Sequence, residues 1–289
     1  MKLHIVSDVH LEFRHKPFRF PFKDKADTLV IAGDFGYVYN RDGKTNHMFV
    51  DTLQNLTKEF EHIIYVPGNH EYYQSHGNLA QVESDIKFIC DTLGIHFLQK
   101  DSWIHPNGIR FVGCTLWSDI DEKGCLQSND FVHIFDKQQD YLLLHLNHKQ
   151  WLQETLATSN KPTIVVTHHL PSFQGVAAKF QGENNTGYAT NLESLFQFPV
   201  IGWICGHTHF PANIKINHIP LYINPIGYPG ELLPRPFYAF ECKIPPQDLA
   251  TDQAQWCQTE PTENALEEAN TSEAIIAIES NLSISDVHN

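Results

Sequence analysis

The chain has 289 residues, of which 42% are hydrophobic, and its formal net charge is −14. This length suits one large α/β domain with or without an appendage, and the acidic balance argues against a broad nucleic-acid-binding surface. No apolar run approaches the roughly 18 residues of a membrane span. The six cysteines form no CxxC pair, and the amino terminus carries no signal-peptide pattern. We therefore expect a cytoplasmic protein with free thiols.

Short apolar runs rich in β-branched residues, bounded by glycine and proline signals, predict buried strands. Five such runs are each followed at once by a block rich in Asp, His or Asn. The five runs cover residues 3–6, 28–32, 62–66, 163–166 and 200–205. Strand ends in an α/β sheet converge on one edge, where open sheets bind ligands. The five blocks therefore predict a single site.

Between these strands, apolar residues at helical spacing predict three helices, over residues 46–61, 79–93 and 137–156. Residues 97–117 predict a β-hairpin with its turn at Pro106-Asn107-Gly108. Further short strands are expected at 212–216, 221–223 and 237–244. The alternation of strands and helices predicts an α/β domain over residues 1–244.

Residues 245–289 differ from the rest of the chain in composition. The segment opens with Pro245-Pro246 and holds nine Asp and Glu residues with no Lys or Arg. Such a polar, acidic segment is typical of a disordered or loosely docked appendage. An apolar patch at 274–278 leaves open a docked helix near residues 270–281.

The blocks after the strands offer a set of metal-ligating groups. Asp8 and His10 share a face as residues i and i+2, and the two oxygens of Asp34 could bridge two ions. An amide oxygen and three imidazoles complete the set, from Asn69, His168, His207 and His209. Mixed nitrogen and oxygen ligands suit Zn, Mn or Fe rather than a thiolate site.

Taken in order, the blocks resemble the five signature motifs of the calcineurin-like metallophosphoesterases. They read Asp8-x-His10, Gly33-Asp34, Gly68-Asn69-His70-Glu71, His168 and Gly206-His207-Thr208-His209, within residues 1–240. Any single block is weak evidence, but all five in order after strands form a strong signal. The resemblance implies a four-layer α/β/β/α sandwich, with two mixed sheets flanked by helices, and a dinuclear metal centre.

The resemblance also implies a role for each residue of the blocks. One ion would be held by Asp8, His10, Asp34 and His209. The other would be held by Asp34, Asn69, His168 and His207. His70 matches the family's non-ligand histidine, which contacts the phosphate and is thought to protonate the leaving oxygen.

Three further residues are candidates for the second shell or for substrate contact. His169 follows the fourth block, and a purely structural role for it is equally open. Tyr72, like its neighbour Tyr73, follows the third block and could line the pocket, although aromatic residues there more often serve packing. Tyr228 lies in a turn-rich loop, 224–230, that resembles a loop of uncharacterised family members.

Two departures narrow the subclass. Gly33-Asp34 is not followed by the Asp-Arg-Gly signature of the Ser/Thr protein phosphatases, and the chain has the Gly-His-x-His block that those enzymes lack. The pattern is therefore closer to the small phosphodiesterases.

We predict a phosphoesterase in which a hydroxide bridging two divalent ions (Mn, Fe or Zn) attacks a phosphate ester and His70 acts as general acid. A small, nucleotide-like phosphodiester is the leading substrate class. A phosphomonoesterase or a nuclease on the same site, or a non-enzymatic metal-binding scaffold, are the alternatives. Substrate identity and oligomeric state are not readable from the sequence.

Overall fold

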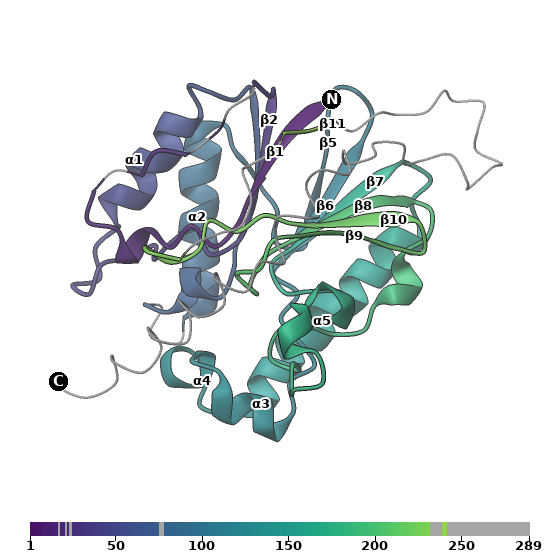
Figure 1. Ribbon diagram of the computed structural model, residues 1–289. Helices are drawn as coiled ribbons and strands as arrows, with labels where there is room; N and C mark the ends of the chain where they lie inside the picture. The colour runs from purple at the N-terminus through teal and green to yellow at the C-terminus, as the bar shows by residue number, and fades with distance from the viewer. Residues whose placement is uncertain (17, 21, 23–24, 75–77, 232–238, 242–289) are drawn as a thin grey trace, which may run out of the picture. The chain divides into compact units, whose positions relative to one another are not determined.

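The computed structural model describes residues 1–16, 18–20, 22, 25–74, 78–231 and 239–241 (Figure 1). The first of its two sheets has the strand order β11-β1-β2-β3-β4. Strands β1 to β4 run parallel, and β11 pairs antiparallel with β1. Their bounds are β1 Lys2–Val6, β2 Thr28–Ala32, β3 His62–Val66, β4 His96–Phe97 and β11 Ala239–Glu241.

The second sheet has the order β5-β6-β7-β8-β10-β9 and is mixed. Strands β6, β7, β8 and β10 run parallel, while β5 and β9 pair antiparallel at the two edges. The bounds are β5 Asp101–Ile104, β6 Arg110–Cys114, β7 Thr163–Thr167, β8 Val200–Cys205, β9 Ala212–Ile216 and β10 Ile219–Ile223. The predicted hairpin is confirmed as β5 and β6, whereas Phe97 belongs to β4 of the first sheet.

Helix α2 spans Leu79–Leu93, as the periodicity predicts, and begins where the Asn78 side chain accepts a hydrogen bond from the Gln81 N–H. Helix α5 spans Gln138–Ala157, within one residue of the prediction. Helix α1 spans His47–Leu56 and ends earlier than predicted, because the chain turns at residues 57–59. The short helices are α3 Glu122–Gln127 and α4 Asp130–His133, with 3-10 turns η1 Leu11–Phe13, η2 His70–Tyr72, η3 Phe173–Gly175, η4 Ala178–Phe180 and η5 Glu193–Leu195.

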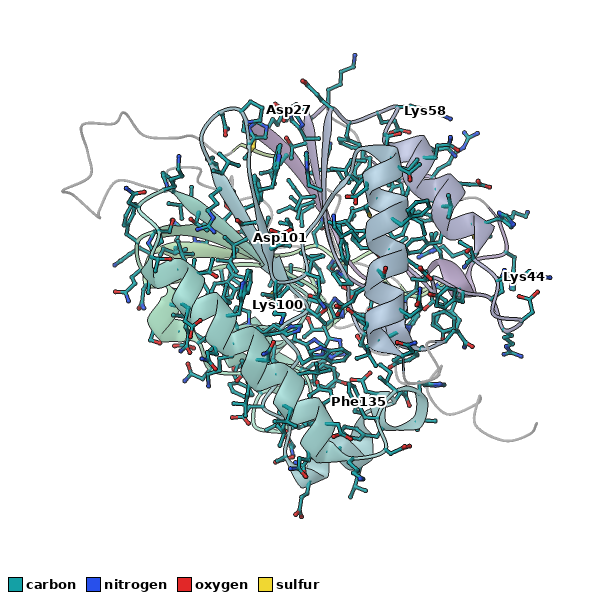
Figure 2. The ribbon with its side chains drawn as sticks, turned by 180° about the vertical axis from the view of Figure 1, so that it is seen from behind. Asp27, Lys44, Lys58, Lys100, Asp101 and Phe135 are labelled. Carbon is teal, nitrogen blue, oxygen red and sulfur yellow. The ribbon has the colours of Figure 1, made fainter. Side chains whose placement is uncertain are left out.

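Three clusters of buried side chains establish the layering. One joins the facing sides of the two sheets and includes Ile5, Val30, Phe111 and Val166. A second packs the outer face of the first sheet against α1 and α2, and a third packs the outer face of the second sheet against α5. Figure 1 shows α1 and α2 on one side of the sheets and α5 on the other, and Figure 2 shows the side chains between them from behind. The fold is the predicted four-layer α/β/β/α sandwich with two mixed sheets.

The parallel strands carry the blocks to a common edge. Strands β1, β2, β3, β7 and β8 each end immediately before one of the five blocks. Every residue of β2 and of β7 is buried, as expected for strands covered on both faces. The predicted acidic appendage, residues 245–289, lies outside the described residues. Within the described part of the chain, no helix has the length and apolar character needed to cross a membrane.

Candidate metal centre

The loops at this edge hold five of the seven predicted ligands in the left-handed backbone region. Their φ angles lie between 49° and 72°, and the residues are Asp8, His10, Asp34, His207 and His209. Each such residue costs about 1–3 kcal/mol and persists only where surrounding contacts impose it. Here the loops cross-link: the Asp8 N–H bonds the Gly33 carbonyl and the His10 N–H bonds the Asp34 carbonyl, both at 3.0 Å. Strain concentrated in this way is typical of functional sites.

Two glycines of the blocks are required by close approach. A Cβ added at Gly68 would overlap the backbone and the carboxylate of Asp34. At Gly33, where φ is +84°, a Cβ would overlap the His168 ring and lie 2.8 Å from the Gly68 Cα. Glycine at both positions therefore lets the loops after β2 and β3 meet beside the His168 imidazole.

His10 and His209 face each other, with their Nε2 atoms 2.9 Å apart. His10 Nδ1 lies 3.0 Å from the Glu12 carboxylate, and His209 Nδ1 lies 3.0 Å from the Glu231 carboxylate. Because a carboxylate only accepts hydrogen bonds, both Nδ1 atoms carry a hydrogen and both inward Nε2 atoms present lone pairs. Two facing lone pairs at this distance need a shared cation, either a proton or a metal ion.

His168 and His207 repeat the arrangement a short distance away. His168 Nδ1 lies 2.9 Å from the Ala32 carbonyl oxygen, and His207 Nε2 lies 3.3 Å from the Gly187 carbonyl oxygen. Both outer nitrogens are therefore donors. The inward atoms, His168 Nε2 and His207 Nδ1, lie 3.2 Å apart and again turn lone pairs toward each other.

Asp34 joins the two groups. Its Oδ1 accepts the His70 backbone N–H at 2.9 Å, while its Oδ2 lies 3.3 Å from His168 Nε2 and 3.8 Å from His10 Nε2. Asp8 belongs to the first group, with Oδ1 3.7 Å from His209 Nε2. Both carboxylates are buried, at 0% and 2% exposure.

Asn69 completes the second group through its amide oxygen. The Asn69 Nδ2 donates to the Tyr73 hydroxyl at 3.0 Å and to the Asp130 carboxylate at 2.8 Å. This fixes the amide, so Oδ1 faces inward, 3.0 Å from His168 Nε2. Asp130 is buried on α4, far along the chain from the Asn69 block.

The donor set fits divalent cations. Three groups of side chains have ligand atoms within 4.8 Å of one another, and two of them match the predicted ligand sets: Asp8, His10 and His209 form one cluster, and Asp34, His168 and His207 form the other. The third group, His10, Glu12 and His70, shares His10 with the first cluster. Each of the two clusters consists of buried carboxylates and imidazole lone pairs that point at one another, an arrangement that is costly without positive charge. Although burial lowers the pKa of His168, the Asp34 and Asp8 carboxylates raise it to about 10. Positive charge is therefore strongly favoured at this point.

His70 lies beside these clusters without joining the two ligand groups. Its Nδ1 lies 2.7 Å from Glu12 Oε1, and its Nε2 lies 3.9 Å from Asp34 Oδ2. The ring stacks on Tyr73, with centroids 4.3 Å apart and planes at 24°. Burial opposes protonation, but the carboxylates of Asp34 and Glu12 outweigh it and raise the pKa of His70 to about 9.

A comparison with protein families matches residues 1–211 to the model described as calcineurin-like phosphoesterase. The chain belongs to this family. It is accordingly a metal-binding phosphoester hydrolase. The expected family is thus confirmed, together with its fold and the presence of histidine and aspartate clusters suited to divalent metals.

This calcineurin-like phosphoesterase has low sequence identity to two similar proteins. It is 28% identical over 270 residues to "Uncharacterized protein L509" of Acanthamoeba polyphaga mimivirus, covering 79% of this chain and 92% of that one. Among solved structures, the phosphopantetheinyl hydrolase PptH of Mycobacterium tuberculosis aligns with a TM-score of 0.59 at 19% identity. That alignment covers 79% of this chain and 90% of the other. At this identity the structural likeness establishes the fold alone.

The three residues predicted to support the ligands or to contact substrate, Tyr228, His169 and Tyr72, occupy different places in the phosphoesterase. Tyr228 packs over the site, with its ring centroid 4.4 Å from both His10 and His209, and is 39% exposed. His169 is fully buried behind His207, with ring centroids 4.1 Å apart, so it can support that ring but cannot meet substrate in this arrangement. Tyr72 points away, and its hydroxyl donates to Glu83 at 3.0 Å.

Of the two tyrosines expected to line the pocket, Tyr73 lies beside the site and Tyr72 does not. Tyr73 stacks on His70 and bonds Asn69, whereas Tyr72 is buried against Trp117, with ring centroids 5.7 Å apart. The expectation that Tyr72 lines the site is therefore wrong. The two tyrosines differ because the 3-10 turn η2 directs adjacent side chains to different sides.

Sequence reasoning missed four carboxylates that organise the centre. Glu12 and Glu231 orient the two facing histidines, Asp130 orients Asn69, and Glu71 joins the loops after β2 and β3 by accepting from backbone N–H groups of both. Glu71 belongs to the third block and Glu12 follows the first block by two residues, so their position near the site could have been inferred from the sequence. No local pattern marks Asp130 or Glu231, which come from distant segments.

Proposed function

We propose that this protein is a dinuclear metal-dependent phosphoesterase acting on a small phosphodiester. The observation that carries the proposal is that hydrogen-bond acceptor atoms of several side chains point toward the space around Asp34 Oδ2. Four imidazoles turn lone pairs into two neighbouring clusters, and that carboxylate oxygen approaches both. One ion would be held by Asp8, His10, Asp34 and His209, and the other by Asp34, Asn69, His168 and His207. The ligand set suits Mn, Fe or Zn.

When bound, two such ions would clamp the phosphate oxygens and make a hydroxide available near neutral pH. The chain's own contribution is a positioned proton. His70 Nδ1 is held by Glu12, so its Nε2–H faces Asp34 and the clusters. From there it can donate to the oxygen that leaves phosphorus, a contribution of about 10²–10⁴ in rate for a positioned general acid.

A phosphodiester of nucleotide-like size is favoured because the blocks are closest to those of small phosphodiesterases. Exposed rings beside the clusters support a substrate with a planar or apolar group: Phe13 is 44% exposed and Tyr188 45%. Phe13 packs edge-on against Tyr228 at 5.3 Å, and Tyr188 lies 5.2 Å from the His207 ring. A monoester on the same site is the second candidate.

The test uses metal-stripped protein reloaded with Mn, Zn or Fe. Hydrolysis of the diester bis-p-nitrophenyl phosphate is compared with that of the monoester p-nitrophenyl phosphate. A phosphopantetheinyl diester is tested as well, because the structural neighbour from Mycobacterium tuberculosis is called a phosphopantetheinyl hydrolase. We expect two ions per chain, metal-dependent turnover, a preference for the diester, and loss of turnover in Asp34→Ala. Two bound ions with no turnover of any ester would instead support the scaffold alternative.

A further inference from the structure

One oxygen of the Glu12 carboxylate lies between His10 and His70. In the proposed function, His10 is a metal ligand and His70 is the general acid. Glu12 belongs to the 3-10 turn η1, and its side chain is 5% exposed. Its Oε1 lies 3.0 Å from His10 Nδ1 and 2.7 Å from His70 Nδ1. The two rings meet edge to face, with centroids 4.4 Å apart and planes at 74°. Glu12 therefore contacts both rings on the side away from Asp34.

Donor and acceptor chemistry assigns the hydrogens of both rings. Because Glu12 Oε1 can only accept, the Nδ1 atoms of His10 and His70 both donate. The opposite nitrogens then face Asp34 Oδ2, at 3.8 Å for His10 and 3.9 Å for His70. In His10 the inward Nε2 offers a lone pair, whereas in His70 the inward Nε2 can carry a second hydrogen.

Packing alone leaves the orientation of these rings open. His10 is covered by Tyr228, with centroids 4.4 Å apart, and His70 by Tyr73, with centroids 4.3 Å apart. Stacking restrains a ring's plane, but a rotation of 180° about the Cβ–Cγ bond keeps that plane and exchanges nitrogen and carbon positions at little packing cost. The Glu12 contact is the interaction that selects which nitrogen faces inward.

Glu12 is also poorly suited to a purely structural role. Its second oxygen, Oε2, is buried and has no hydrogen-bond partner among the described residues. A buried carboxylate is costly unless it is paired, so the contacts of Oε1 with the two imidazoles, rather than packing, account for a glutamate at this position.

We propose that Glu12 is a positioning residue that couples metal binding at His10 to proton donation by His70. The inference rests on the proposed function. During hydrolysis, a water-derived oxygen bonds to phosphorus and the bond from phosphorus to the leaving oxygen breaks. The His70 Nε2 hydrogen passes to that leaving oxygen, and water later returns a proton to the ring. Glu12 remains a carboxylate throughout and holds both Nδ1 atoms.

The chain supplies a matched control in Glu231. This carboxylate binds His209 Nδ1 as Glu12 binds His10 Nδ1, but its described hydrogen bonds include none to His70. Glu12→Gln and Glu231→Gln should both weaken the affinity for one metal ion, by about 10–100-fold. Calorimetric titration of the metal-stripped proteins with Mn measures this effect independently of activity.

The two variants should differ in their dependence on the leaving group. Turnover is measured at saturating Mn on two esters with the same retained group, one releasing p-nitrophenol and the other ethanol. Ethoxide needs a proton to depart and p-nitrophenolate does not. Glu12→Gln should lower kcat on the ethyl ester by about 10²-fold, with much less effect on the p-nitrophenyl ester. Glu231→Gln should lower both to the same extent.

Equal losses on the two esters in Glu12→Gln would overturn the coupling, since Glu12 would then act on the metal alone. Saturation of the wild type with three ions, one of them lost in Glu12→Gln, would overturn it as well, because Glu12 would itself be a ligand. If Glu12→Gln does not fold, Glu12→Asp keeps the charge with a shorter reach, and the same ethyl-specific loss is expected. A wild type inactive on both esters would refute the proposed function itself.

Discussion

Replacing the buried Glu71 by glutamine, which has nearly the same size, is expected to destabilise the fold strongly. Glu71 Oε1 accepts from the Phe35 N–H and the Tyr65 hydroxyl, both at 2.7 Å. Its Oε2 accepts from the Asp34 N–H at 3.1 Å and the Gly68 N–H at 2.7 Å. All four partners are donors, so the position requires acceptors at both ends of the side-chain group.

Glutamine has one acceptor oxygen and one NH₂ group. With the NH₂ group toward the Asp34 and Gly68 N–H groups, both of their hydrogen bonds are lost. With it turned the other way, the Phe35 N–H bond is lost and the Tyr65 hydroxyl must turn from donor to acceptor. Hydrogen bonds to a charged acceptor contribute about 1.5–3 kcal/mol each, so Glu71→Gln should reduce the free energy of unfolding by about 1.5–6 kcal/mol. The same bonds join the loops that carry Asp34 and Asn69, so metal affinity should fall as well.

Urea unfolding of the metal-stripped protein measures the effect. Burial and the Asp34 carboxylate raise the pKa of Glu71 to about 7, so the comparison is made at about pH 8, where the carboxylate predominates. Glu83→Gln is the control, because Glu83 Oε1 accepts from Tyr72 and Gln99 and a glutamine oxygen can replace it. That variant should lose less than about 1 kcal/mol. If Glu71→Gln loses no more than Glu83→Gln, the acceptor argument is wrong.

Two further predictions concern other buried groups. Burial, with Lys100 nearby, lowers the pKa of His148 to about 3, so the unfolded chain binds a proton that the fold excludes. The free energy of unfolding should therefore fall by up to about 1.4 kcal/mol per pH unit as the pH falls from about 6.5 to 3. In His148→Gln this dependence on pH should be weaker. Urea unfolding at a series of pH values measures both. Asp130→Ala releases the Asn69 amide and should weaken Mn binding by about 10–100-fold in calorimetry; unchanged affinity would refute that role.

Much of the fold follows from local patterns in the sequence. The strands before the five blocks are β-branched and apolar because both of their faces are covered, and helix α2 has apolar residues at helical spacing from Leu79 to Leu93. The seven predicted ligands follow strand ends, and parallel strands bring their ends to one edge. Periodicity and strand-end position are properties of neighbouring residues, so the sequence by itself predicted the α/β class, the common edge and the seven candidate ligands. The four-layer arrangement was an expectation from the resemblance to the family.

Tertiary structure decided which groups support those ligands. Asp130 reaches Asn69 across 61 positions, and Glu231 reaches His209 across 22. Tyr73 rather than Tyr72 meets His70 because the turn η2 sets their directions. Such contacts depend on the angles at which loops leave different strands and on which side chains those loops bring within hydrogen-bond distance. Neither quantity is encoded in a local pattern, so the orientation of each imidazole and amide was open until the packed sheets defined it.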